Sequence, residues 1–358
     1  MFGEKRYPES LSPEELDIYL ANGWYRMGQS IFTTHFLCFH DQFFSALWVR
    51  LSLKNYEFSK SLRKIIRRNY SAFDIRFQPV QITPEKEALY QKYKQSFPGQ
   101  LAPTLEDSLH EGFDGNIYNT FETLVYDGDK LIAFSFFDLG EKSAASILGV
   151  YDHDYHKHSL GLFTVLLEII FCIKNDFDFF YPGYVVPGNT RFDYKLRIGP
   201  VDYYNLKTNQ WIEFNGLDEA EIPLFKMEQK LKKIQQLFLA HDLKATHYYY
   251  PLFEANLFGY WNAPYFDYPN LLMLEYQGEK KNYLAVVFDP REDTYQLLRC
   301  TEFDNVFFYF NSEFVNTFDQ KKYFTELITT DKLIAESEDE QEIFEIAREM
   351  ILTRVEKK

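Results

Sequence analysis

The sequence has 358 residues, of which 46% are hydrophobic, and a formal net charge of −15 at pH 7. This length suits two or three domains with packed cores, and the acidic balance of the whole chain argues against binding nucleic acid, because phosphates require positive charge. With no apolar run of bilayer length, no signal-peptide pattern and three widely separated cysteines, we expect a cytoplasmic protein without disulfides or membrane contact.

The charge is unevenly distributed along the chain. Residues 50–76 contain eight Lys or Arg residues and only two acidic ones. Within this segment, SKSLRKIIRRNYSAF at 59–73 predicts a short helix, because its apolar residues recur at helical spacing. The opposite side of that helix carries the residues that we call the basic stripe: Lys60, Arg63, Lys64, Arg67 and Arg68.

The first hundred residues predict two helices with defined starts and strands between them. Ser12 is followed by Pro and, three residues on, by Glu, which is a capping-box pattern for a helix of about three turns. Thr83 followed by Pro begins a second helix in the same way. The apolar segment 31–53 predicts one or two buried strands, and the alternating segment 73–80 predicts another.

The middle of the chain predicts a strand–helix–strand unit. Residues 121–152 form two or three strands, with Asp127-Gly128 as a hairpin turn. An apolar helix begins at about Ser159, and a strand follows at 177–185. A helix that links two strands of one sheet indicates a βαβ crossover, so we expect an α/β (α+β) fold with a mixed sheet.

Two Pro-Gly pairs flank Tyr184 in the segment YPGYVVPGNTRFDYKLRIGP. We expect these pairs to stop the strand, bend the backbone and return the chain as a second strand over 192–197. This arrangement would turn Tyr184 toward the helix start at Ser159 and bring Lys195 to the same cleft from the other side.

Residues 215–358 have a different character. A long amphipathic helix at 222–242 precedes four segments that predict antiparallel strands, and a helix follows an acidic run. The strand segments are 271–277, 283–289, 294–300 and 305–311, and the last helix is 340–355. We therefore divide the chain into residues 1–80, an acyltransferase domain at 81–214 and an appended α+β module at 215–358.

Three separated blocks carry a resemblance to a known family. They are NGWYRMGQSIF, then FSKSLRKIIRRNYSAF, then YDHDYHKHSLGLFTVLLEI followed by YPGYVVPGNTRFDYKLRIGPVDYY. In this order they resemble aminoacyl-tRNA–protein transferases, namely the arginyl-tRNA–protein transferases and the bacterial leucyltransferases that act on Asp/Glu N-termini. The resemblance spans roughly residues 20–205 and implies a GNAT-like core that moves arginine or leucine from aminoacyl-tRNA to the N-terminal amine of acceptor proteins.

The resemblance implies a role for several residues. Tyr184 would orient the amine or stack on the terminal adenosine, Lys195 would meet the 3′-end phosphates or the developing oxyanion, and Asp152 would act as general base. The helix start at Ser159 would offer free N–H groups to a phosphate, unless Ser159 is a plain helix cap. The further implied substrate contacts are Gly161, Gly183, Tyr194 and Arg197. The basic stripe would bind the tRNA backbone.

One departure from the family concerns cysteine. The family has an N-terminal cysteine cluster linked to iron–sulfur binding, whereas this region holds only Cys38, between His35 and His40. We therefore expect no metal and no cofactor, with aminoacyl-tRNA as the donor. Two alternatives stay open: a CoA-dependent GNAT-type N-acyltransferase, although Phe163 stands where that class has a small residue, and a non-catalytic adaptor that binds tRNA or N-termini.

Overall fold

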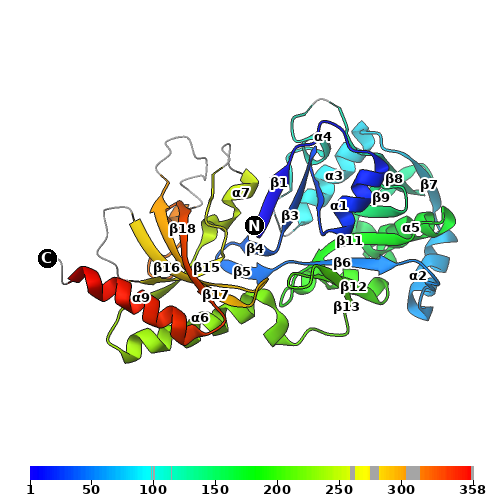
Figure 1. The fold of residues 1–358 in the computed structure, drawn as a ribbon. Coiled ribbons are helices and arrows are strands. Elements are labelled where there is room, and N and C mark those ends of the chain that lie inside the picture. Colours follow the sequence, from blue (N-terminus) through cyan, green and yellow to red (C-terminus); the bar gives the residue numbers. More distant parts are fainter. Residues whose placement is uncertain are drawn as a thin grey trace.

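The structure, a computed structural model, describes residues 1–97, 99, 101–113, 115–258, 263–274, 282–303 and 315–355. It shows a mixed α/β chain whose largest element is an eight-stranded mixed sheet, and a second, five-stranded sheet lies beside it (Figure 1). The predicted fold class is thus confirmed. Among the described residues, no helix combines the length and the apolarity that crossing a bilayer requires.

The eight-stranded sheet has the order β13-β12-β6-β11-β10-β9-β8-β7. Its neighbours pair antiparallel, with one exception, the parallel pair of β10 and β11. The strands are β6 (Leu47–Ser52), β7 (Asp74–Pro79), β8 (Thr120–Asp127), β9 (Lys130–Leu139), β10 (Ser143–Tyr151), β11 (Phe179–Val185), β12 (Val201–Asn205) and β13 (Gln210–Glu213).

Helices cover both faces of this sheet. Alternate residues of β9 face opposite sides: Phe134 and Phe136 pack on the third helix, whereas Ala133 and Phe137 face the fifth. The helices are α1 (Pro13–Ala21), α2 (Lys60–Tyr70), α3 (Pro84–Ser96), α4 (Leu105–His110) and α5 (Leu160–Lys174), with 3₁₀ segments η1 (His153–His158) and η2 (Thr190–Ile198). Helix α5 connects β10 to β11, which confirms the predicted crossover.

The elements with local start and turn signals are confirmed. The Ser12 hydroxyl accepts the Glu15 N–H and the Glu15 carboxylate accepts the Ser12 N–H, which completes the capping box of α1. The Thr83 hydroxyl caps α3, and the turn after Asp127 joins β8 to β9.

The reading of the two Pro-Gly pairs as strand breaks is wrong for the first pair. Pro182 and Gly183 lie inside β11, where they form an irregularity in the pairing with β6 rather than an end. The predicted strand over 192–197 is wrong as well, because η2 occupies these residues. The Asn189 side chain accepts the Arg191 N–H and starts η2, whose tighter path carries Lys195 inward to a buried position.

The N-terminal residues form more strands than predicted. Instead of one or two strands over 31–53, four short strands follow one another, because the chain turns at His35, at His40 and Asp41, and at Ala46. They are β3 (Ser30–Thr34), β4 (Phe36–Phe39), β5 (Gln42–Ser45) and β6; β1 (Gly3–Arg6) and β2 (Tyr25–Met27) flank β3 in a separate sheet. Strands β6 and β7 belong to the large sheet, so residues 1–80 and 81–214 share that sheet.

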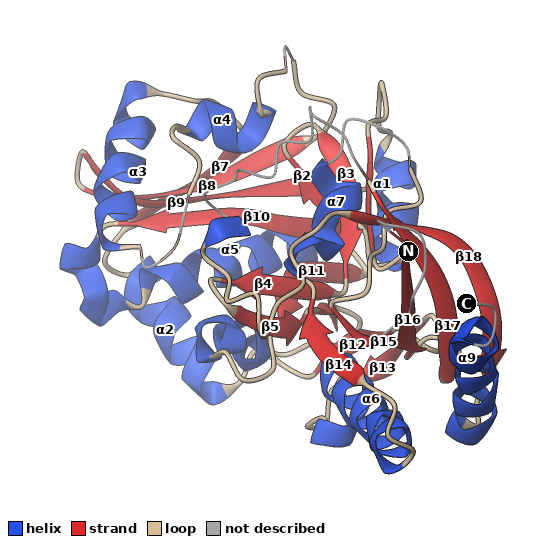
Figure 2. Cartoon of the chain, turned by 90° about the vertical axis from the view of Figure 1, so that its left-hand side faces the viewer, coloured by secondary structure: helices blue, strands red, loops and turns tan. Residues whose placement is uncertain are grey.

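The C-terminal residues form an antiparallel sheet in the order β14-β15-β16-β17-β18, with helices α6 and α9 packed beside it (Figure 2). The elements are η3 (Glu219–Glu221), α6 (Pro223–Ala240), β14 (Ala245–Tyr249), η4 (Pro251–Glu254), α7 (Ala255–Phe258), β15 (Asn270–Leu274), β16 (Asn282–Asp289), β17 (Thr294–Glu302), β18 (Ile328–Ser337) and α9 (Glu340–Val355). The predicted strand 305–311 and the end of 271–277 lie outside the described residues.

The N-terminus ties the C-terminal module to the rest of the chain. Phe2 is buried in the hydrophobic core of that module, and its N–H donates to the Asp267 carboxylate at 2.6 Å. The Leu224 N–H, at the start of α6, donates to the Ser45 hydroxyl at 3.0 Å. The module therefore packs on the first strands of the chain.

A buried ion pair fixes the segment NGWYRMGQSIF against the large sheet. The guanidinium of Arg26 donates to Asp138 on β9 at 2.9 Å and to the Thr120 hydroxyl on β8 at 2.9 Å. It also donates to the Leu109 carbonyl and lies over the Tyr118 ring. The two charged side chains are 2% and 0% exposed, so the loss of either one leaves the other without its partner.

We predict that Arg26→Ala lowers the free energy of unfolding by about 3–5 kcal/mol, because it leaves the Asp138 carboxyl buried without its counter-ion. Denaturant unfolding measures this loss. The control is Arg6→Ala, which removes the exposed pair between Arg6 and Glu4 and should cost no more than about 1 kcal/mol. Equal losses in the two variants would contradict the structural role of Arg26.

Candidate active site

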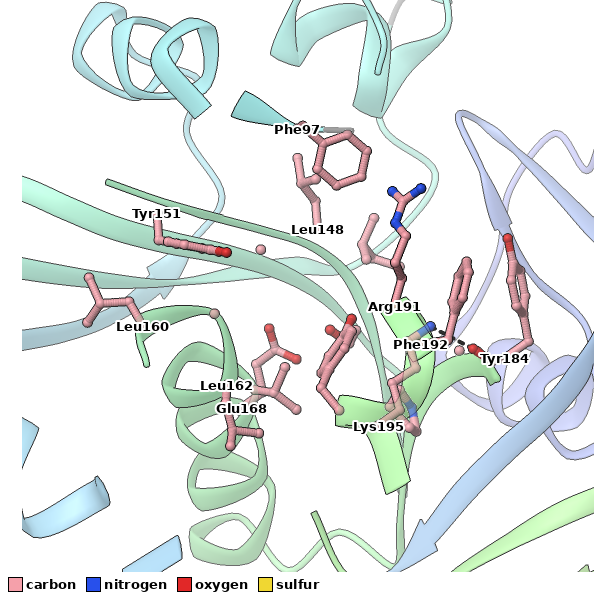
Figure 3. Close-up of a pocket in the computed structure, with 18 of the residues that line it drawn as sticks. Phe97, Leu148, Tyr151, Leu160, Leu162, Glu168, Tyr184, Arg191, Phe192 and Lys195 are labelled. Atoms are coloured by element: carbon pink, nitrogen blue, oxygen red, sulfur yellow. Dashed lines mark hydrogen bonds between the residues drawn. The ribbon is translucent and has the colours of Figure 1, made fainter. Parts of the chain in front are cut away.

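A cavity opens where the two parallel strands separate. Strands β10 and β11 pair only between Ser143–Ala145 and Phe179–Tyr181, and both become irregular just beyond that point, in their pairing with β9 and β6 respectively. The cavity has a volume of about 730 Å³ and is lined by both strands, the start of α5 and η2 (Figure 3). This is the size of a small-molecule site rather than of a packing defect.

The cavity collects seven of the eight residues that the resemblance assigns to catalysis or substrate binding. They are Ser159, Gly161, Gly183, Tyr184, Tyr194, Lys195 and Arg197. They come from three elements, α5, β11 and η2, that the sheet topology brings together.

The start of α5 faces this cavity without a side-chain cap. Ser159 adopts the left-handed conformation (φ 55°, ψ 45°) and makes no side-chain capping bond, so it is not a plain helix cap. The next residues begin the helix, and first-turn N–H groups have no partner within a helix. Gly161 lets the Tyr151 ring pack directly on the helix start, because a Cβ there would lie 2.8 Å from Tyr151 Cε1. The helix start can therefore receive an anion.

Lys195 lies in the cavity wall formed by η2. Its side chain is buried, and its Nζ donates to the Tyr184 carbonyl at 2.8 Å (Figure 3). Within the described part of the chain, no carboxylate forms an ion pair with it; its remaining neighbours are the rings of Tyr184, Phe192 and Tyr194. Burial lowers the pKa of Lys195 to about 7, so its ammonium and amine forms coexist near neutral pH.

Gly183 makes room for that ammonium. Its φ of +96° disfavours any residue with a side chain, and a Cβ there would lie 2.9 Å from Lys195 Nζ. The first Pro-Gly pair therefore does not end the strand as predicted but makes β11 irregular at the point where the Lys195 side chain lies against its backbone.

Aromatic rings form the wall around Tyr184. The Tyr184 ring lies 5.0 Å from Trp48 and 5.5 Å from Phe192, centroid to centroid. Burial raises the pKa of Tyr184 to about 12, so the phenol stays protonated at neutral pH and can donate a hydrogen bond. Arg191 lies over the Phe97 ring on the same side of the cavity (Figure 3).

Asp152 does not line this cavity, whereas the other two residues predicted to be catalytic, Tyr184 and Lys195, do. Its carboxylate is buried and accepts hydrogen bonds from Lys92 at 2.6 Å and Lys130 at 2.8 Å. Although burial opposes them, these two ammonium groups and the Asp154 N–H lower its pKa. A carboxylate stabilised in this way is a weak proton acceptor, which favours a structural role for Asp152 at the start of η1 over the predicted role of general base.

Glu168 is the cavity residue that the sequence reasoning missed. It lies on α5, is 0% exposed, and neither carboxyl oxygen has a hydrogen-bond partner among the described residues. Burial raises its pKa to about 8, with smaller opposing contributions from the Ser135 and Ser146 hydroxyls. The signal in the sequence was one acidic residue within the otherwise apolar helix segment LGLFTVLLEIIF.

The basic stripe is exposed on α2, and its five members form no ion pair with an acidic residue in the part of the chain that the structure describes. Helix α2 packs on α5. At its end, the Asn69 amide donates to the His158 carbonyl at 2.9 Å, directly before Ser159. The basic stripe therefore lies on a helix that is attached to the end of the cavity where α5 begins.

The segment from His35 to His40 contains one thiol, that of Cys38. Cys38 is half-buried on β4, where burial raises the pKa of its thiol to about 12, and its Sγ contacts the His40 carbonyl. His35 is half-buried, and burial of its ring lowers its pKa to about 3. No group of three or more potential ligand side chains suited to a metal ion occurs among the described residues.

We predict that burial of Lys195 makes stability depend on pH in a specific window. Its ordinary pKa is 10.5, whereas its folded-state pKa is about 7. Between these values the unfolded chain binds the proton that the folded chain has lost, so this lysine makes the free energy of unfolding rise with pH. The rise should be absent in Lys195→Met.

The measurement is urea unfolding of wild type and variant at about pH 7 and about pH 9. The stability of wild type relative to Lys195→Met should increase between these two conditions. Lys64→Met, at an exposed position of the basic stripe, is the control and should show no such change. A pH-independent difference between wild type and Lys195→Met would contradict the buried position of the ammonium.

Known proteins resemble this chain over the part that forms most of the cavity. Residues 85–205 match the family of the arginine-tRNA-protein transferase C terminus. The aspartate/glutamate leucyltransferase of Leptospira interrogans is 30% identical over 217 residues, which cover 58% of this chain and 81% of that protein. The protein of the same name from Vibrio cholerae is 27% identical over 206 residues, covering 57% of this chain and 85% of its own.

One solved structure that resembles the chain is a GCN5-related glucosamine N-acetyltransferase region of a fungal multidomain β-N-acetylglucosaminidase. It is 13% identical, covers 53% of this chain and 21% of that one, and has a TM-score of 0.29. A likeness at this level carries no argument, so the description of the fold rests on the strand order. The sequence matches, in contrast, identify the family. This chain belongs to the aminoacyl-tRNA–protein transferases, which move an amino acid from aminoacyl-tRNA to a protein N-terminus.

Proposed function

We propose that this chain transfers arginine or leucine directly from aminoacyl-tRNA to the α-amine of cytoplasmic proteins that begin with Asp or Glu, without a cofactor. The names of its relatives support both choices of donor, since the family model describes arginine transfer and the curated proteins are leucyltransferases. The curated names also support Asp and Glu as acceptor residues. The matches favour aminoacyl-tRNA over CoA as the donor, in agreement with Phe163 near the start of α5.

The observation that carries this proposal is Lys195, a buried lysine in the cavity that forms no ion pair among the described residues. An aminoacyl ester is already activated, so the enzyme has to align an amine with the carbonyl and stabilise the oxyanion that forms. Lys195 supplies a positive charge for that oxyanion, and the start of α5 at Ser159 and Gly161 supplies N–H groups for a 3′-end phosphate. Tyr184 supplies a protonated phenol for the ribose or the adenine.

The surroundings of the cavity suit the two substrates. The basic stripe on α2 gives the tRNA acceptor stem a positive surface, and the contact between Asn69 and His158 connects that surface to the helix start. The aromatic wall suits stacking on the terminal adenine, as base–aromatic stacking does in single-stranded nucleic-acid binding. Tyr194 and Arg197 line the side of the cavity formed by η2, where we place the acceptor peptide.

The test is transfer of labelled amino acid from a total pool of charged tRNA onto peptides that differ only in their first residue. We expect arginine or leucine to appear on peptides that begin with Asp or Glu and not on matched peptides with an acetylated N-terminus. Lys195→Ala should slow transfer by raising its activation free energy by about 2–4 kcal/mol, as for loss of an oxyanion stabiliser. Transfer at the wild-type rate by Lys195→Ala would exclude this lysine from catalysis.

A separate prediction concerns the basic stripe. Replacement of Arg63, Lys64, Arg67 and Arg68 by Ala should weaken tRNA binding and reduce the slope of log affinity against log salt by about 3, with about 0.7–0.9 per lost phosphate contact. Binding at several salt concentrations measures this slope. Lys244→Ala and Lys332→Ala, at exposed positions of the C-terminal module, serve as controls. An unchanged slope in the stripe variant would show that tRNA binds elsewhere.

A further inference from the structure

Glu168 is a buried acid without a counter-ion among the described residues, and it lies in the proposed reaction site. Figure 3 shows its carboxyl group pointing from α5 into the cavity, on the opposite side from Lys195. Both of its oxygens are shielded from solvent and lack a hydrogen bond within the described residues. Burial of an ionised carboxylate without a counter-ion is costly, so the folded protein keeps this group neutral until a cation arrives.

The groups that face Glu168 come from four elements. They are the Cys172 thiol on its own helix, the Tyr194 hydroxyl on η2, and the Ser135 and Ser146 hydroxyls on β9 and β10. Each is uncharged at neutral pH, and burial raises the pKa of both Cys172 and Tyr194. Among the described residues, no cationic side chain contributes to the pKa of Glu168. The cationic side chains that line the cavity, Lys195 among them, form no ion pair with Glu168 among the described residues, so its carboxylate is available to a cation from a substrate.

We propose that Glu168 binds the α-ammonium group of the acceptor and takes its proton, so that the neutral amine attacks the aminoacyl ester. This inference rests on the proposed function. The ammonium enters an apolar cavity, and the carboxylate is the negative charge that compensates its lost hydration.

The protons and bonds balance in this sequence. The acceptor ammonium gives one proton to the Glu168 carboxylate, and its nitrogen forms a bond to the ester carbonyl carbon. The tetrahedral intermediate then loses the bond to the ribose oxygen, and the second proton of the nitrogen passes to that oxygen. The products are the new peptide bond and a tRNA with a free ribose hydroxyl. Glu168 ends protonated, as it was before the acceptor bound, so the one proton that the reaction yields is the proton released to solvent when the ammonium paired with the carboxylate.

The strength of Glu168 as a base suits this role. Its pKa is about 8, and a peptide α-amine has a pKa of about 8 as well. Burial therefore brings Glu168 closer in base strength to the amine than an ordinary glutamate is, and a general base is most effective when its pKa lies near the working pH. Asp152, whose pKa is lowered by two lysines, would be a far weaker base.

The test compares two acceptors in single-turnover transfer from charged tRNA. One is a peptide with an ordinary α-amine, and the other is the same peptide with an α-hydrazino terminus, whose nucleophilic nitrogen is neutral at pH 7. Glu168→Gln should slow transfer to the amine by about 100-fold or more and transfer to the hydrazine by no more than about threefold, because only the amine requires a base. Glu9→Gln, at an exposed position outside the cavity, is the matched control and should leave both rates unchanged.

The outcomes separate the possible accounts. Equal slowing of both acceptors would overturn the proposal, because Glu168 would then serve the α-ammonium group of the donor or the fold. Unchanged rates with both acceptors would also overturn it, while leaving the proposed function intact. Failure of the wild-type protein to transfer to either acceptor would overturn the proposed function itself.

A second measurement on the wild-type protein does not depend on how the variant folds. Calorimetry in buffers of different ionisation enthalpy should show that binding of the amine peptide at pH 7 releases about one proton, because the neutral Glu168 must ionise to pair with the ammonium. The acetylated peptide should release none. Binding of the amine peptide without proton release would contradict the pairing.

Discussion

Two strands that begin as parallel partners and then separate are the constraint on which the rest of this structure depends. Strand β11 leaves β10 after three residue pairs and continues as the antiparallel partner of β6. The crossover helix α5 has to start at the open end of this separation, because it connects the same two strands. The start of α5, the edges of β10 and β11, and η2 therefore meet at one cavity. Each of these elements is irregular over part of its length at most.

The cavity holds two ionisable groups that burial drives toward their neutral forms. Lys195 and Glu168 come from different elements, η2 and α5, and neither has a partner of opposite charge among the described residues. Each would be more stable when exposed or paired, so their burial lowers the stability of the fold in order to prepare a site. This contrasts with Arg26 and Asp138 and with Asp152 and its two lysines, where buried charges are paired and the role is structural.

The sequence predicts those features whose causes are local. The helix starts at Ser12 and Thr83 and the turn after Asp127 depend on neighbouring residues and are confirmed. Residues 192–197 were predicted as a strand, because aromatic and basic residues are interleaved there. The 3₁₀ path of η2 depends instead on burial of Lys195 against β11, which no local pattern reports. Seven of the eight residues that the family resemblance assigned to catalysis or substrate binding line the cavity. The resemblance did not report the environment of Asp152, because the lysines that bind this carboxylate are 60 and 22 residues away. It also passed over Glu168, which lines the cavity together with residues of η2.

The central claim is that the separation of β10 and β11 is the acyl-transfer site. The most direct measurement is a crystal structure of the protein with an aminoacyl-adenosine analogue in which an amide replaces the ribose ester. The account predicts that the analogue binds between the start of α5 and Lys195, with its carbonyl oxygen toward the Lys195 Nζ and its adenine against the aromatic wall. An analogue bound outside this cavity, with Lys195 and Glu168 untouched, would contradict it.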